Sequence, residues 1–254
     1  MIAQSYIIFF LLILARLGAF FTTIPIMSMK QIPNQVKLAI VVVLTYMASI
    51  ITPVSVIETE SFLSFAMLVI NEVFVGAVLG LSSNIIFLAI QSGGDFIDTI
   101  AGLKMASSYD PLTGANTSLY STVFNWLGVV LFFSMQGPHF LIKGIVNSLY
   151  IFPVGLDYTI AFSAQSIIFL ATKSFLIGLQ IALPIGIIIF FVDIVLGMIS
   201  RAVPQMNVFL LGMPLKLLTS FGVFMLLAGG VLRTVSFALE NVLTVLDEVM
   251  KMIS

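Results

Sequence analysis

The sequence has 254 residues, of which 60% are hydrophobic and only 8% are charged, whereas soluble domains carry about 25% charged residues. Together with a mean hydropathy of +1.21, this excludes an ordinary soluble domain and predicts an integral membrane protein. The net charge of -1, without a basic block, excludes the electrostatic footprint of a nucleic-acid-binding protein. The lack of cysteine excludes disulfides, thiolate metal sites and cysteine nucleophiles.

The first apolar run covers residues 2–29 and is interrupted only by Arg16. It lacks a charged n-region and a small-residue cleavage site, so we expect a retained membrane segment. The connector "KQIPNQVK" follows, and its Pro33 and Lys37 suit the start of a second helix over residues 38–57. Lys30 and Lys37 predict that this connector faces the cytoplasm.

The third apolar run, residues 62–90, contains Glu72 and the closely spaced glycines Gly76 and Gly80. Because about 20 residues cross a bilayer core, this run is too long for one untilted crossing, and we expect a break or a strong tilt. A polar loop is predicted next, over about residues 91–118.

Three more apolar regions complete the predicted membrane part. One spans residues 119–135 and, after "GPHFLIKG", resumes up to Pro153. The next spans residues 160–192, with Lys173 and Pro184 inside it, and the last spans residues 208–231. We count five or six possible crossings, which predicts an all-α, polytopic membrane protein of broken or tilted helical hairpins.

The segment "RAVPQMNVFLLGMPLK", residues 201–216, interrupts the last two apolar regions. Pro disfavours helix at the residue before it, and Gly and Pro recur further on, so the segment predicts a bend between two helices. A simple hairpin connector explains the same turn residues. The predicted bend consists of Pro204, Gln205, Asn207, Gly212 and Pro214.

An amphipathic helix is predicted over about residues 234–254, as part of one membrane-embedded domain that covers residues 1–254. Its apolar residues recur at alternating spacings of four and three, which forms a seam on one face. Packing against its own bundle and packing against a partner subunit both explain this seam. A membrane-surface helix is disfavoured because the polar face is acidic.

Charged side chains inside apolar runs are the sharpest individual signals, because a charge at mid-bilayer is costly unless it is paired or hydrated. They are Arg16, Glu72, Lys173, Asp193, Arg201 and Lys216. Glu72 and Asp193 could serve a proton relay in a transporter, whereas pairing with opposite charges or backbone carbonyls inside an assembly is the simpler interpretation.

Enzymatic signals are weak, and we expect a protein without catalytic, cofactor or metal sites. The single histidine, His139, excludes a site with two histidine ligands, and there is no G-x-S-x-G motif. A buried or interfacial imidazole is the expected state of His139. Asp95 and Asp98 lie three apart, where capping or solvation is favoured over metal binding.

Five blocks in order, from about residue 15 to residue 216, carry a family resemblance. They are "ARLGAFFTTIPIMSMKQIPNQVK", "NEVFVGAVLG", "GGDFIDTIAGLKMASSYDPLTG", "GPHFLIKGIVNSLYIFPVG" and "ALPIGIIIFFVDIVLGMISRAVPQMNVFLLGMPLK". This ordered set resembles the FliR-type subunit of the flagellar type III protein export gate, which has relatives in virulence injectisomes.

The resemblance implies a subunit that joins FliP-type and FliQ-type proteins in a closed helical cone in the flagellar basal body of the inner membrane. An FlhB-type switch protein is a further implied partner. Unfolded flagellar proteins would cross through the centre of the cone. In this family the central polar loop plugs the closed pore, which implies a plug at about residues 102–116. Its residues include Lys104, Met105, Ser107, Ser108, Tyr109, Asp110, Pro111 and Gly114.

Three alternatives remain open from the residues alone. An injectisome subunit would share most of these blocks, although "NVFLLGMPLK" favours the flagellar form. A small-molecule or ion transporter would use the intramembrane charges. A purely structural membrane scaffold would conduct nothing.

Overall fold

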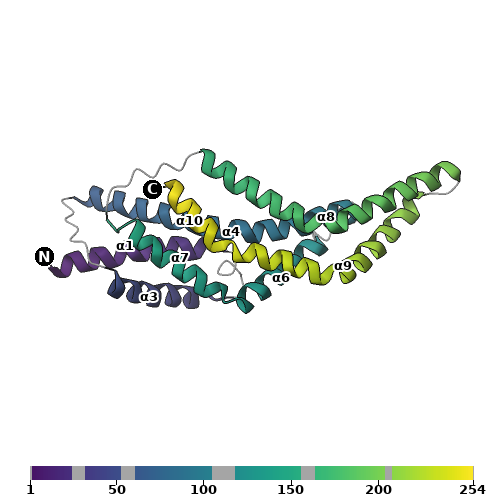
Figure 1. Ribbon diagram of the computed structural model, residues 1–254. Helices are drawn as coiled ribbons and strands as arrows, with labels where there is room; N and C mark the ends of the chain where they lie inside the picture. Colours follow the sequence, from purple (N-terminus) through teal and green to yellow (C-terminus); the bar gives the residue numbers. More distant parts are fainter. Residues whose placement is uncertain are drawn as a thin grey trace. The chain divides into compact units, whose positions relative to one another are not determined.

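The computed structural model describes six ranges, namely residues 2–24, 32–52, 61–104, 118–155, 164–203 and 208–253. Within these ranges all regular structure is helical, which confirms the predicted all-α class. The helices are α1 (Ile2–Thr23), α3 (Asn34–Ile51), α4 (Phe62–Ile100), α6 (Leu119–Ser134), α7 (Gly137–Ile151), α8 (Ala164–Ala202), α9 (Val208–Glu240) and α10 (Val242–Ile253) (Figure 1). Among the described residues five helices are long and apolar enough to cross a membrane, or six crossings if α6 and α7 together make one.

Helix α4 is longer than the sequence predicted. It contains 39 residues without a break, or about 58 Å at 1.5 Å per residue, against a hydrocarbon core of about 30 Å. Residues 91–100, which we expected in the polar loop, are its last turns. The small polar residues there allow close packing: a side chain at Gly94 would overlap the backbone of Ser121, and one at Gly93 would meet Ile181.

The chain forms two compact units. The first contains Met1–Ile85, Gln136–Leu170 and Asn241–Ser254, and the second contains Ile86–Met135 and Ala171–Glu240. In the first unit α1 lies beside α3, and α10 packs against α7 (Figure 1). Gly76 and Gly80 face α1 so closely that a side chain at either would overlap the backbone of Arg16 or Phe20. Small residues four apart thus let α4 and α1 approach, as is common between membrane helices.

In the second unit α6 packs against α9 through aromatic rings. Tyr120 contacts Phe221 and Phe224 at centroid distances of 5.5 and 5.8 Å, and Phe124 also contacts Phe224 at 5.8 Å. The buried Tyr120 hydroxyl donates to Ser220 Oγ at 3.0 Å. The polar end of the ring is therefore satisfied within an apolar contact.

The C-terminal amphipathic segment is divided between two helices, which corrects the predicted single helix over residues 234–254. Helix α9 ends at Glu240 and α10 begins at Val242. In α10 the seam residues Val242, Leu246 and Val249 are buried, whereas Asp247 is exposed. Because α10 packs against α7, the seam serves the protein's own bundle, which was the first of the two predicted explanations.

Candidate functional site

A buried ion pair joins two helices of the first unit. Arg16, in the middle of α1, is 0% exposed, and Glu72, on α4, is 3% exposed. Arg16 Nε donates to Glu72 Oε2 at 2.5 Å. The two intramembrane charges that sequence analysis singled out separately, 56 residues apart, are thus brought together.

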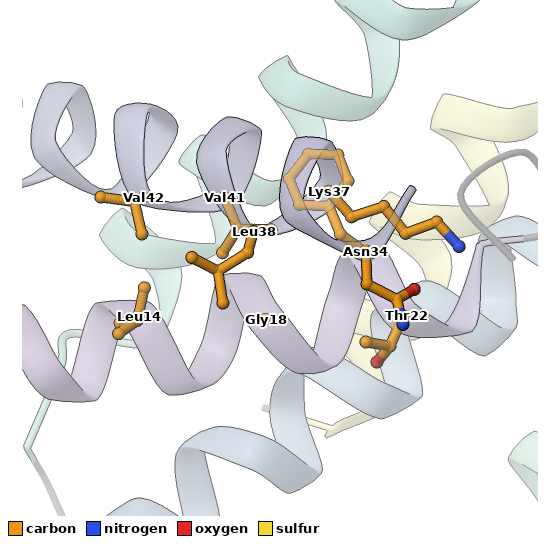
Figure 2. A pocket seen from close by; sticks show the side chains of 9 residues that line it. Leu14, Gly18, Thr22, Asn34, Lys37, Leu38, Val41 and Val42 are labelled. Atoms are coloured by element: carbon orange, nitrogen blue, oxygen red, sulfur yellow. The ribbon is translucent and has the colours of Figure 1, made fainter. Parts of the chain in front are cut away.

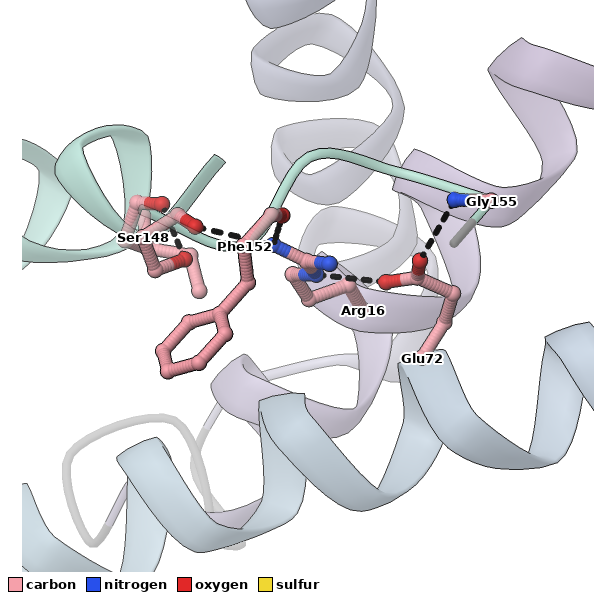
Figure 3. Close-up of polar contacts among 6 residues, drawn as sticks. Arg16, Glu72, Ser148, Phe152 and Gly155 are labelled. Atoms are coloured by element: carbon pink, nitrogen blue, oxygen red, sulfur yellow. Dashed lines mark hydrogen bonds and ion pairs between the residues drawn. The ribbon is translucent and has the colours of Figure 1, made fainter. Parts of the chain in front are cut away.

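The same guanidinium binds the C-terminal end of α7. Arg16 Nη1 donates to the carbonyl oxygens of Ser148, at 3.1 Å, and Phe152, at 2.9 Å. Figure 3 shows the side chain reaching between this helix end and Glu72. The C-terminal end of a helix carries the negative pole of the helix dipole, so a cation is favourable there.

The second carboxylate oxygen of Glu72 anchors the turn that follows α7. Gly155 N donates to Glu72 Oε1 at 3.2 Å, as drawn in Figure 3. Gly155 has a φ of +85°, which glycine adopts without the steric cost of a side chain. The turn can therefore present its N–H to the carboxylate, and sequence analysis missed this partner because a lone glycine carries no charge signal.

This network, formed by Arg16, Glu72, Ser148, Phe152 and Gly155, is called the α1–α4–α7 clamp below. Both oxygens of Glu72 accept hydrogen bonds, and the carboxylate is buried against a fixed positive charge. Such a group holds the three helices in position. Within the described part of the chain, Arg16 Nη2 has no hydrogen-bond partner.

A second ion pair lies in the second unit, between α8 and α9. Lys216 Nζ contacts Asp193 Oδ1. The side chains are 22% and 40% exposed respectively, so this pair is more open than the clamp. The other predicted charges are on α8: Lys173 is half-buried, and Arg201 is exposed in the last turn.

Most of the predicted plug lies outside the described residues. Lys104 is described, and its Nζ lies 3.6 Å from Asp95 Oδ1 on α4. The remaining plug residues, which the structure does not describe, are Met105, Ser107, Ser108, Tyr109, Asp110, Pro111 and Gly114.

The predicted bend is only partly covered by the structure. Pro204, Gln205 and Asn207 lie outside the described residues. Gly212 and Pro214, which we placed in the bend, instead lie inside α9, and this corrects the extent of the bend. A membrane helix tolerates an internal proline where neighbouring groups satisfy the freed carbonyl, so these residues did not have to end it.

Asp98 has a role that its sequence position did not reveal. It is fully buried at the end of α4, and its two oxygens accept from Tyr120 N at 3.0 Å and Ser121 N at 3.1 Å. These N–H groups belong to the first turn of α6, so Asp98 caps that helix from another one. The expected capping therefore takes place across helices. The described residues contain no group of acidic or histidine side chains that could hold a metal ion, and His139 is exposed on α7.

Comparison with known proteins identifies the family. The family model built from the sequences of the bacterial export proteins, family 1, matches residues 7–242 of this chain. The flagellar biosynthetic protein FliR of Bacillus subtilis (strain 168) is 32% identical over 84% of this chain and 83% of its own length. The chain belongs to the bacterial export proteins of family 1.

Two further relatives bear on the kind of export system. FliR of Aquifex aeolicus (strain VF5) is 28% identical over 93% of this chain and 90% of its own. The secretion system apparatus protein SsaT of Salmonella typhimurium is 29% identical over only 59% of this chain and 58% of its own. The predicted resemblance is confirmed, and this export protein is a multi-pass inner-membrane component of the flagellar export apparatus.

Proposed function

We propose that this family 1 export protein is a non-enzymatic subunit of the flagellar export gate. With FliP-type and FliQ-type subunits and an FlhB-type switch protein, it forms the channel through which unfolded flagellar proteins cross the inner membrane. The observation that carries this proposal is the similarity to FliR proteins over more than four-fifths of the chain. The injectisome alternative is less favoured because the match to SsaT is much shorter.

The second unit has a surface that suits an assembly. On α8, Phe175, Phe190 and Phe191 are exposed, whereas Ile185 and Ile189 on the same helix are fully buried. Large exposed aromatic side chains are typical anchors between protein subunits. In a gate made of several proteins, these side chains would pack against partner subunits as well as lipid.

Photo-crosslinking tests the proposed partners. A photoreactive amino acid at Phe191, 60% exposed, should give adducts with another export-gate subunit in native membranes. The same amino acid at Ile189, which is buried, is the matched control and should give none. Adducts with lipid alone at Phe191, at Phe190 and at Phe175 would contradict assembly through these exposed side chains.

We also propose that residues 102–116 plug the closed channel. The support is their position in the family resemblance and their small, polar composition, because a segment that buries little apolar area is released at little cost. Deleting residues 102–116 should make cells leak small ions while the protein still assembles. Unchanged permeability together with normal secretion would refute the plug.

A further inference from the structure

A cavity of about 500 Å³ lies between α1 and α3 in the first unit. Its walls are mainly aliphatic, with Leu14 on α1 and Leu38, Val41 and Val42 on α3. Figure 2 shows these side chains at one end of the cavity, and Lys37, Asn34 and Thr22 gathered at the other. The cavity thus has an apolar part and a polar, positively charged mouth.

Gly18 explains why the space is open. It lies on the wall that α1 contributes, and a Cβ atom added to it would meet no atom within 4 Å. Unlike Gly76 and Gly80, it does not allow another helix to approach closely. The absence of a side chain here leaves room for an occupant from outside the chain.

The mouth of the cavity favours an anion. Lys37 is in the first turn of α3, and that turn contains no acidic residue. A cation near the positive end of a helix dipole is electrostatically unfavourable. An anion bound there would be stabilised both by the ammonium group of Lys37 and by the helix dipole. Lys30 and Lys37 also predict a cytoplasmic position, where anionic lipids are concentrated.

We propose that this cavity binds one anionic phospholipid, with an acyl chain along Leu14, Val41 and Val42 and the phosphate head group at Lys37, Asn34 and Thr22. The volume lies within the range of about 300–1,000 Å³ typical of ligand sites. Little more than one turn of a helix about 10 Å across would fill the whole cavity. A flexible acyl chain therefore fits the cavity better than a partner helix does. The proposal is independent of the channel function.

Competition between two lipids tests the proposal. The full-length protein, purified in detergent, is mixed with equal amounts of phosphatidylglycerol and phosphatidylcholine that have the same acyl chains. Native mass spectrometry then measures which lipid is retained. We expect about a fivefold preference for phosphatidylglycerol, as one lysine near a head group provides.

Two variants separate the contributions of the polar and the apolar part of the cavity to lipid retention. Lys37→Gln should bring the preference close to one, whereas Lys143→Gln, at an exposed lysine on α7, should preserve it. Gly18→Leu should abolish retention of both lipids by filling the cavity. Gly222→Leu is its control, because Gly222 on α9 also has no atom near the added Cβ and does not line the cavity.

Three results would overturn the proposal. They are equal retention of the two lipids by the unmodified protein, an unchanged preference in Lys37→Gln, or undiminished retention in Gly18→Leu. If Gly18→Leu instead weakened binding of a gate subunit and left lipid retention unchanged, the cavity would be a protein contact.

Discussion

At the scale of single residues, the α1–α4–α7 clamp uses the buried charge of Arg16, which would be unfavourable alone, to hold three helices together. Arg16 is buried among apolar helices, and its cost is offset by Glu72 and by two carbonyls at the end of α7. Removing one member of a buried ion pair typically costs about 3–5 kcal/mol, because the other charge remains uncompensated. The first unit should therefore be sensitive to each partner separately.

We predict that Arg16→Met and Glu72→Leu each lower the free energy of unfolding by about 3–5 kcal/mol. The double variant should be less destabilised than the sum of the single variants, because neither charge is then left alone. Denaturation of the purified protein in detergent measures all three. Additive losses would mean that the two side chains do not interact.

Exchanging the two charges distinguishes the clamp from a simple ion pair. In Arg16→Glu with Glu72→Arg the opposite charges are kept, but a carboxylate at position 16 cannot donate to the Ser148 and Phe152 carbonyls. We expect this exchange not to restore stability. Full restoration would show that the carbonyl contacts contribute little.

At the scale of elements, two residues of α4, Gly76 and Asp98, determine how this helix meets its neighbours. Gly76 allows α4 to lie against the backbone of α1. We predict that Gly76→Ala lowers the thermal unfolding midpoint, because the added methyl group overlaps the Arg16 carbonyl oxygen. Gly222→Ala, at an open position on α9, should be neutral or stabilising by up to about 1 kcal/mol through helix propensity.

The cap from Asp98 to α6 gives a further prediction. In Asp98→Leu the N–H groups of Tyr120 and Ser121 lose their acceptors, at about 1–3 kcal/mol for each buried group. Hydrogen exchange at the start of α6 should therefore become faster. Asp95→Leu, three residues away and half exposed, is the control; equal protection in both variants would mean that the cap is unimportant.

The sequence predicted the helical class, and also apolar segments long enough for five or six crossings, because runs of about 20 apolar residues are easily recognised. That the charges within these segments lie inside the membrane stays a prediction. It placed residues 91–100 in a loop because small and polar residues resemble loop composition, although here they line close helix contacts. The pairing of Arg16 with Glu72 and the cap by Asp98 depend on tertiary proximity, for which a single sequence carries no signal. The predicted bend wrongly included Pro214, because membrane helices tolerate an internal proline.

At the scale of the whole molecule, many large apolar side chains are exposed on α8 and α9, among them Phe190, Phe191, Met225 and Leu226. Such surfaces are stable only in contact with lipid or other subunits. This agrees with membership of the bacterial export proteins, family 1. We therefore expect the protein to act as one component of a larger flagellar export gate.

Secretion of flagellar proteins tests this central claim most directly. A strain in which the gene is deleted should release no hook or filament protein into the culture medium, and the unmodified gene supplied from a plasmid should restore release. A Glu72→Leu copy should restore much less, because the clamp is broken. Normal release of hook and filament proteins by the deletion strain would contradict a role in the flagellar export gate.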